Sequence, residues 1–326
     1  MVLCRALLRP AAAASILPTV RPYVLKIPMP AWFCGLVDRQ SCDVPIYSYG
    51  VMLGISFIVG WYLASWLAQK DGLPVEKVAR LYVRTAVGAI IGARVLYFVA
   101  NPDRMESPLT FLKVWEGGLV AYGGFIGGLI ASTIFCRMNG ISLLQWADCA
   151  VPSLGTGLFF TRIGCFLYGC DFGGTTDAAW AVRFPRSSPA WHEQVRHGLI
   201  DLDAARSLPI HPTQLYESLF GLGLFALAML VRRYRRFSGE VFLAFFATYG
   251  VVRSYFETLR VDPQRGGFGP LTTSQWIGLT SLLLAIAAYV VLYRRYRANP
   301  SAARLWELAP AAVVAPARKK GGKRDA

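Results

Sequence analysis

Arg162 is the residue whose type and surroundings first suggest chemistry. It lies inside the apolar, glycine-rich run of residues 152–174, PSLGTGLFFTRIGCFLYGCDFGG. A charged side chain at membrane depth costs about 3 kcal/mol on insertion scales, so it is tolerated where it faces a polar cavity or an anionic partner. Snorkelling of the side chain to the membrane interface is the alternative. We therefore treat Arg162 as a candidate for binding an anion.

Further cations lie in or beside apolar segments. Arg253 and Glu257 are four residues apart, so they share one face of a helix and can pair. Arg94 and Arg260 add two more cations, with few carboxylates nearby in sequence. Because the guanidinium fork donates two parallel hydrogen bonds to phosphate, this excess of arginine predicts a site for an anionic lipid or a phosphorylated substrate.

Two short runs place polar or small residues at the starts of apolar segments. In HPTQLYE, residues 211–217, part of the polarity is explained by helix capping, with Thr213 as N-cap and Gln214 and Glu217 serving the first turn. WEGGLVAYGGFIGG, residues 115–128, has a glycine density that permits close approach of another helix or of a ligand. Tyr122 lies between its glycines and offers a phenol as donor or, less readily, as base.

The cysteines do not have the spacing of a metal site. Seven cysteines and three histidines occur, without a CxxC pair or a histidine cluster, so we expect no metal. If residues 165–210 face an oxidising compartment, Cys165 with Cys170, and Cys34 with Cys42, are permitted to form disulfides. Free buried thiols are the alternative.

Composition indicates a polytopic membrane protein. The 326 residues are 55% hydrophobic and 16% charged, and the mean hydropathy is +0.41, which is outside the range of an ordinary soluble domain. The net charge of +15 comes from basic residues at the ends of apolar segments, where they orient spans and attract anionic lipid. We therefore expect no nucleic-acid partner.

We expect an all-α fold with about seven transmembrane helices, since a hydrocarbon core of about 30 Å requires apolar stretches of about 20 residues. Lysines and arginines follow the first, third, fifth and seventh segments, which makes that side cytoplasmic. The N terminus is then outside and the C terminus inside. The expected spans are 48–68, 82–100, 117–136, 145–163, 212–231, 240–258 and 273–293.

Three regions follow from these spans. Residues 1–45 are expected to form a non-spanning extension on the outer side, because Pro10 and Pro18 break their short apolar parts. Residues 46–298 form the transmembrane catalytic domain, with a small irregular head of residues 165–210 inserted on the outer face. Residues 299–326 form a basic cytoplasmic tail.

In combination, four motifs resemble the prolipoprotein diacylglyceryl transferase family. They are WEGGLVAYGGFIGG, TRIGCFLYG at 161–169, HPTQLYE at 211–217 and RSYFETLR at 253–260. The resemblance covers about residues 45 to 295 and follows the family's order of motifs. It implies a bacterial inner-membrane enzyme with seven spans and a periplasmic head. Such an enzyme moves a diacylglyceryl group from phosphatidylglycerol to the lipobox cysteine of a prolipoprotein signal peptide, releasing glycerol phosphate.

The resemblance also implies site residues. By matching positions, Arg162 and Arg253 bind phosphate, and Glu257 has an orienting role. Tyr122 completes the catalytic set. No cofactor is implied. The substrate-binding candidates are Tyr49, Arg94, Glu116, Gly123, Gly124, His211, Gln214, Tyr216, Glu217 and Arg260.

The chain departs from the family pattern at two positions. Tyr122 stands where the family commonly has histidine before the paired glycines, so a histidine general base is not available at this position. Cys165 stands where asparagine is common, which changes the hydrogen bonding beside Arg162 or permits a disulfide to Cys170. Proton removal from the thiol by Tyr122, by water or by a phosphate oxygen remains open.

Other classes of protein are less well matched. A transporter or binding protein for an anionic lipid or solute would have internal repeats and paired interrupted spans, which the sequence does not show. Another lipid enzyme would have a histidine nucleophile or clustered aspartates on a metal, and Asp148, Asp171 and Asp177 are not so spaced.

Overall fold

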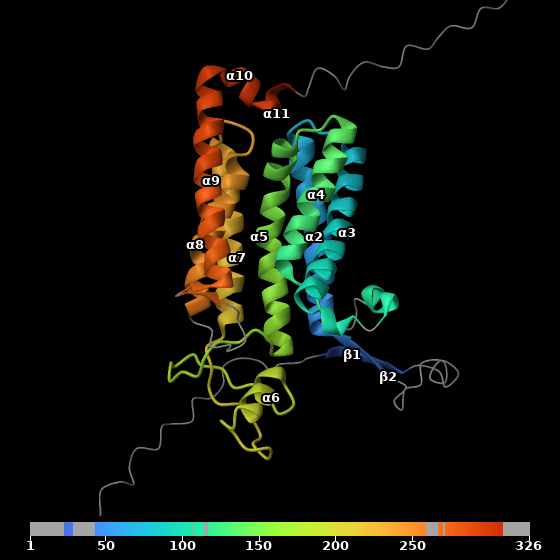
Figure 1. Cartoon of the computed structure of the whole chain (residues 1–326), viewed down its shortest axis with the longest axis vertical. Coiled ribbons are helices and arrows are strands. Elements are labelled where there is room, and N and C mark those ends of the chain that lie inside the picture. Colours follow the sequence, from blue (N-terminus) through green and yellow to red (C-terminus); the bar gives the residue numbers. More distant parts are fainter. Residues whose placement is uncertain are drawn as a thin grey trace, which may run out of the picture. The chain divides into compact units, whose positions relative to one another are not determined.

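The computed structural model describes residues 23–28, 43–105, 107–113, 117–258, 267–269 and 271–308, and long helices dominate them. Figure 1 shows the elements in chain order. The long helices are α2 (Ser48–Lys70), α3 (Val75–Ala100), α4 (Ala121–Asn139), α5 (Leu143–Tyr168), α7 (Thr213–Tyr234), α8 (Glu240–Thr258) and α9 (Thr273–Ala298). The short elements are β1 (Tyr23–Pro28), β2 (Asp43–Tyr47), η1 (Pro102–Arg104), η2 (Pro108–Leu112), α6 (Pro189–Arg196), β3 (Gly267–Phe268), β4 (Leu271–Thr272), α10 (Pro300–Ala303) and α11 (Leu305–Leu308).

The long helices confirm an all-α polytopic membrane protein. Each of the expected spans overlaps one of them. In the part of the chain that the structure describes, six are long and apolar enough to cross a membrane: α2, α3, α4, α5, α7 and α9. Helix α8 is 19 residues long but carries Glu240, Arg253 and Glu257, which lower its hydropathy.

The chain divides into two compact units. The first unit comprises residues 1–58, 155–224 and 248–282, and the second comprises 59–154, 225–247 and 283–326. Helices α2, α5, α7, α8 and α9 contribute residues to both.

The first unit contains a small, irregular head between α5 and α7. Its apolar core is formed by Phe166, Val182, Phe184, Ala190 and Ile210. Isolated bridges, such as the one between Val182 and Ile210, replace a regular sheet. The short helix α6 begins after Ser188, whose hydroxyl accepts a hydrogen bond from Trp191 N at 3.3 Å. The irregular structure expected for this segment is confirmed, and the side of the membrane on which it lies remains a prediction.

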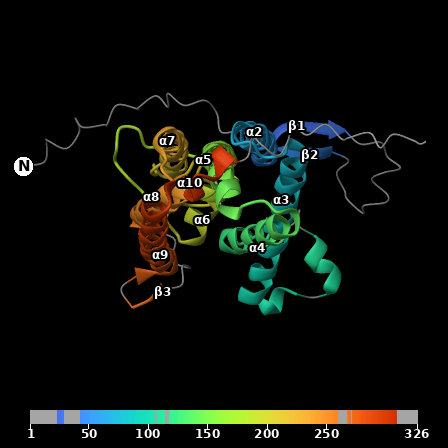
Figure 2. The same cartoon turned by 90° about the horizontal axis from the view of Figure 1, so that it is seen from above.

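In the second unit, α3 and α4 lie side by side (Figures 1 and 2). Glycines allow this approach: a Cβ at Gly123 would collide with Gly92 O, and one at Gly127 would collide with Gly88 O. The glycine-rich run predicted for close approach therefore serves helix packing along much of its length. A larger apolar core of the same unit includes Leu67, Leu81 and Trp146.

A buried ion network also belongs to the second unit. Asp71 Oδ1 lies 2.5 Å from Arg232 Nη2 and 2.7 Å from Arg235 Nη2. Asp148 accepts from the backbone N–H groups of Gly239 and Phe242, so it caps the start of α8. The sequence suggested that the arginines after the fifth apolar segment set the orientation of the spans. Two of them, Arg232 and Arg235, form ion pairs with a buried carboxylate.

Candidate anion and thiol site

Arg162 lies in the last two turns of α5 and is held by two carboxylates of the first unit. Its Nη2 atom is 2.7 Å from Glu217 Oε2, and its Nη1 atom is 3.2 Å from Asp171 Oδ2. The side chain of Glu217 is only 3% exposed, whereas that of Asp171 is 41% exposed. Glu217 is therefore the fixed anchor of the guanidinium, and Asp171 is the partner that an incoming anion can replace.

The start of α7 fixes the loop that carries Asp171. Gln214 Nε2 donates to Cys170 O at 2.7 Å, and Thr213 Oγ1 donates to Asp171 O at 3.0 Å. Both side chains are fully buried. The sequence expectation that Thr213 and Gln214 serve their own first turn is corrected, because these hydrogen bonds go to the 170–171 backbone. Gln214, predicted to bind substrate, thus has a positioning role.

Two residues turn the chain at the end of α5. Gly169 has φ +86°, and Asp171 has φ +55°. A left-handed backbone is easily adopted by glycine and is tolerated by aspartate. The turn brings Cys170 back toward Cys165, and Cys170 N donates to Cys165 O at 3.1 Å. Position 171 is therefore suited to Asp or Asn.

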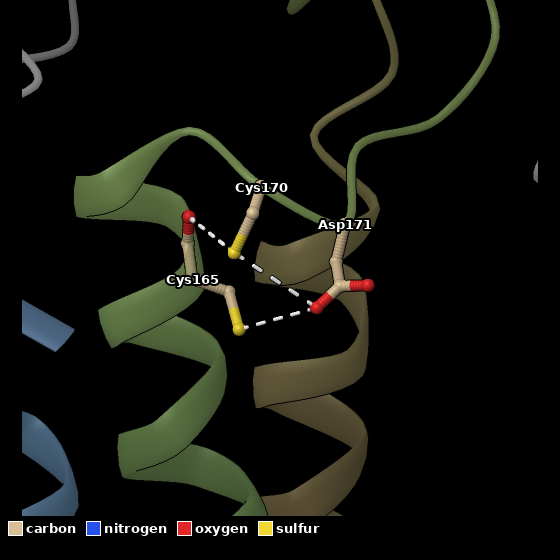
Figure 3. Close-up of side chains that lie close together, drawn as sticks. All are labelled: Cys165, Cys170 and Asp171. Carbon is tan, nitrogen blue, oxygen red and sulfur yellow. Dashed lines mark hydrogen bonds between the residues drawn. The ribbon is translucent and has the colours of Figure 1, made fainter. Parts of the chain in front are cut away.

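Cys165, Cys170 and Asp171 form a compact cluster, shown in Figure 3, in which both thiols point toward the carboxylate. One ligand-type atom from each residue lies within 4.8 Å of the others. The Cys165 thiol donates to Asp171 Oδ2 at 3.5 Å, and the Cys170 thiol does so at 3.9 Å. Both cysteines are free thiols here, so the disulfide alternative is not the state observed. Cys34 and Cys42 lie outside the described residues.

Tyr49, a predicted substrate-binding residue, lies beside this cluster. It stands at the start of α2 and packs on α5, because a Cβ at Gly164 would lie 3.2 Å from Tyr49 Cα. Its hydroxyl lies near Arg162, Asp171 and the two thiols. Tyr49 and Arg162 are thus brought together, as the sequence predicted for members of one site.

Arg253 and Glu257 form the expected ion pair on α8. Arg253 Nη1 lies 2.7 Å from Glu257 Oε2. Tyr249, one turn earlier on the same face, lies near Arg162, and its ring stacks on Phe220 of α7. This face of α8 therefore contributes to the surroundings of Arg162 within the first unit.

His211 and Tyr216 lie together near the head. The Tyr216 hydroxyl is 3.3 Å from His211 Nδ1 and accepts from Trp180 Nε1 at 2.6 Å. Each is partly exposed. These two predicted substrate-binding residues join α7 to the head through Trp180.

Arg94, in the second unit, is bonded to the backbone of a loop. It is 3% exposed and donates to five backbone carbonyls at 2.5–3.1 Å. The acceptors are Phe111, Gly117, Gly118, Thr110 and Lys113. A guanidinium has five N–H donors, so these bonds occupy all of them. Arg94 thus holds the loop before α4, and its predicted substrate-binding role remains a prediction.

Tyr122, Gly123 and Gly124 begin α4 in the same unit. Gly123 is buried and packs at the crossing with α3, and its predicted contact with substrate remains a prediction. Gly124 is less constrained, since a Cβ there would lie 3.5 Å from Ala89 O. Tyr122 is half-buried, and its place in the catalytic set remains a prediction. Glu116 and Arg260 lie outside the described residues.

Sequence reasoning missed Asp171 and Tyr249 as members of the site. The signal for Asp171 was available: it follows Gly169 at a helix end, and a turn there returns the chain to the helix. We expected no metal because the sequence has no CxxC pair and no histidine cluster. Cys165 and Cys170 are five residues apart, so they do not form a CxxC pair.

The comparison with known families decides the assignment. The family model for prolipoprotein diacylglyceryl transferase matches residues 40–291. The chain belongs to the prolipoprotein diacylglyceryl transferase family. The matched range contains every residue predicted for the site, from Tyr49 to Arg260.

Individual members of the prolipoprotein diacylglyceryl transferase family are similar over most of their length. The chain is 31% identical to a phosphatidylglycerol–prolipoprotein diacylglyceryl transferase of Clostridium tetani over 244 residues, which is 75% of this chain and 92% of that protein. It is 33% identical to the enzyme of the same name from Neisseria meningitidis over 283 residues, which is 78% of this chain and 97% of that protein. The Solidesulfovibrio magneticus enzyme is 34% identical over 73% of this chain and 87% of its own length.

Proposed function

We propose that this chain transfers a diacylglyceryl group from phosphatidylglycerol to the thiol of a lipobox cysteine in a prolipoprotein, forming a thioether and releasing glycerol phosphate. The observation that carries the proposal is the partly buried Arg162 near the end of an apolar helix, with one fixed and one replaceable carboxylate partner. Family membership supports the same activity. The transporter alternative has no support from the matched family.

The leaving phosphate is the first chemical requirement. Displacing it develops negative charge, which preorganised donors in a water-poor site stabilise. Glu217 holds the Arg162 fork in one orientation, and the phosphate takes the place of Asp171 on Nη1. Arg253, oriented by Glu257, supplies the second cation.

Reconstituted transfer tests this assignment. Purified protein in phosphatidylglycerol vesicles is incubated with a lipobox peptide that contains one cysteine, and the peptide mass is measured. We expect the mass of one diacylglyceryl group to be added and glycerol phosphate to appear. Arg162→Ala and Arg253→Ala should each lower transfer by about 100-fold or more, and lysine should not restore it because it lacks the fork.

The control for these variants is Arg196→Ala, since Arg196 is an exposed residue of α6 that pairs with Glu193. It should transfer at the unaltered rate. Modification of a peptide in which serine replaces the cysteine would contradict a thiol acceptor. An active Arg162→Ala variant would reduce Arg162 to a packing role.

We further propose that the protein spans the bacterial inner membrane with residues 165–210 in the periplasm and the tail after Arg297 in the cytoplasm. Basic residues at the ends of α2, α4, α7 and α9 support this orientation. Reporter fusions at Asp201 and after Ala326 should give opposite compartments. The same compartment for both would require an even number of spans between residues 201 and 326.

A further inference from the structure

The thiol cluster of the first unit has the composition of a metal site. Cys165 and Cys170 provide sulfur, Asp171 provides oxygen, and the three ligand-type atoms lie within 4.8 Å of one another (Figure 3). Cysteine thiolate and aspartate are ligands of Zn²⁺, and thiolates select it over hard cations such as Mg²⁺. Three protein ligands leave a fourth tetrahedral position, the arrangement found in catalytic zinc sites.

The scaffold holds these ligands in place. Cys165 is fixed by α5, and its sulfur is buried. Gln214 and Thr213 hold the backbone oxygens of Cys170 and Asp171. Positions 165, 170 and 171 therefore need only small side-chain rotations to converge on one ion.

The charges around the cluster are compatible with a cation, although Arg162 is close. Arg162 Nη1 is 4.0 Å from Cys165 Sγ, so a metal ion would face a positive neighbour. The three negative charges of two thiolates and one carboxylate exceed the two positive charges of Zn²⁺. Glu217 keeps its own ion pair with Arg162. The loaded cluster thus presents net negative charge to the guanidinium.

The reaction supplies a use for such an ion. Thioether formation needs a thiolate, and a free thiol with a pKa near 8.5 is only about 3% ionised at neutral pH. Tyr122 occupies the position at which the family commonly has histidine, and a tyrosine with a reference pKa near 10 is a poor base there. A thiol bound to a zinc ion is deprotonated outright.

We propose that Cys165, Cys170 and Asp171 bind a thiophilic divalent cation, Zn²⁺ by their ligand set, and that the cation's fourth position binds and ionises the acceptor thiol. This inference rests on the proposed transfer activity. The thiol would lose its proton to water as it binds the cation. A sulfur lone pair then forms the S–C bond to the glycerol carbon, and the electron pair of the breaking C–O bond leaves with the phosphate.

Asp171 links the two halves of this step. In the structure it is held by Arg162 through Oδ2, the same oxygen that accepts from both thiols. When phosphate binds Arg162, Asp171 loses its contact with the guanidinium and is held by the metal ion alone. Anion binding and thiol activation are thereby coupled through one exposed carboxylate.

Metal binding is measured without turnover. The full-length protein is reduced, stripped with a chelator and titrated with Co²⁺, whose thiolate complexes give charge-transfer absorbance, and Zn²⁺ is then added as competitor. We expect one equivalent of Co²⁺ to bind and Zn²⁺ to abolish the band. Cys165→Ser and Cys170→Ser should each lose most of it, and Cys136→Ala, a buried cysteine of the second unit, should keep it.

Asp171→Asn is the variant that guards against misfolding, because asparagine also tolerates the left-handed backbone of this position. It should weaken Co²⁺ binding by about tenfold or more while the protein elutes as the unaltered one does. A band that persists in both serine variants, or its absence in the unaltered protein, would overturn the metal site.

The pH dependence of transfer separates this inference from the proposed function. Zinc-loaded protein should have a rate that is nearly constant between about pH 7 and 8.5, and stripped protein should be about 30-fold slower at pH 7, with a rate that rises with thiol ionisation. Equal rates and profiles with and without metal would overturn the metal site and leave the transferase function intact. If the protein shows the Co²⁺ band but the metal-loaded protein transfers no diacylglyceryl group, the proposed function is overturned and the metal site stands.

Discussion

Arg162 Nη2 and Glu217 Oε2 lie 2.7 Å apart in the first unit, and the carboxylate is nearly fully buried. A buried carboxylate that faces a cation fixes the direction of the guanidinium, and its removal leaves an uncompensated buried charge. The same pair therefore affects both stability and the geometry of anion binding. Asp171, on the other branch of the guanidinium, is exposed enough to exchange with substrate.

Glu217→Gln tests this anchor. Glutamine keeps the size and removes the charge, so we expect a loss of about 3 kcal/mol in unfolding free energy. The KM for phosphatidylglycerol should also rise by about tenfold, because Arg162 then pairs more tightly with Asp171. Thermal unfolding in detergent and transfer kinetics would measure the two effects. Glu193→Gln, in an exposed ion pair with Arg196, should change neither; an unaltered KM in Glu217→Gln would remove the anchor role.

Gly123→Ala and Gly124→Ala are a matched pair for the α3–α4 crossing. A methyl at Gly123 meets Gly92 O and Leu96 Cβ, so overpacking should destabilise by about 1–3 kcal/mol. At Gly124 the nearest atoms are at 3.5 and 3.8 Å, and alanine's helix propensity should stabilise slightly. Thermal unfolding of both variants would measure the difference. Equal stabilities would mean that the two helices do not pack as closely as the structure has them.

How far the sequence predicted the fold depends on which force dominates at each place. The long helices were predictable because each needs an apolar stretch of membrane length, and the Arg253–Glu257 pair followed from helical spacing. The roles of Arg94 and Gly123 were not, because a buried arginine bonded to carbonyls and one bonded to phosphate have the same sequence signature. Only the positions of the acceptor carbonyls, in η2 and at residues 117 and 118, separate the two.

The loop held by Arg94 gives a second matched pair. Gly118 has φ +71°, and a Cβ there would lie 2.7 Å from Arg94 Nη1; Gly117 has φ +88° with open space around it. Both alanine variants carry the strain of a left-handed backbone. Only the methyl group of Gly118→Ala also displaces Arg94. We expect Gly118→Ala to be less stable than Gly117→Ala by about 1–3 kcal/mol.

Arg94→Lys tests the same assignment from the other side. Lysine has three donors for five carbonyls, so the protein should lose about 2 kcal/mol or more of stability. The fraction that stays folded should keep the KM of the unaltered protein for phosphatidylglycerol. A raised KM without loss of stability would return Arg94 to the substrate site.

Asp71 is the residue on which we expect the second unit to depend most. It pairs with Arg232 and Arg235, and its backbone oxygen accepts from Gln145 at 2.8 Å. Asp71→Asn should destabilise by about 3–5 kcal/mol, because two buried cations lose their shared carboxylate. Glu307→Gln, which alters an exposed pair with Arg304, should cost less than about 1 kcal/mol. Similar unfolding temperatures for the two variants would contradict a structural role for the network.

Tyr122 is where this chain and its family differ most directly in chemistry. If Tyr122 removes the thiol proton, Tyr122→Phe should lower the maximal rate by about 100-fold or more at every pH. If it positions substrate while the thiol is ionised elsewhere, Tyr122→Phe should raise KM and keep the maximal rate within about tenfold. We expect the second result, because a phenol with a reference pKa near 10 is a weak base at neutral pH.

Maximal rates of Tyr122→Phe and Tyr122→His across about pH 6 to 9 would decide between proton removal and positioning. A histidine variant much faster than the phenylalanine variant at neutral pH would assign proton transfer to this position, because histidine restores a base whose pKa matches that pH.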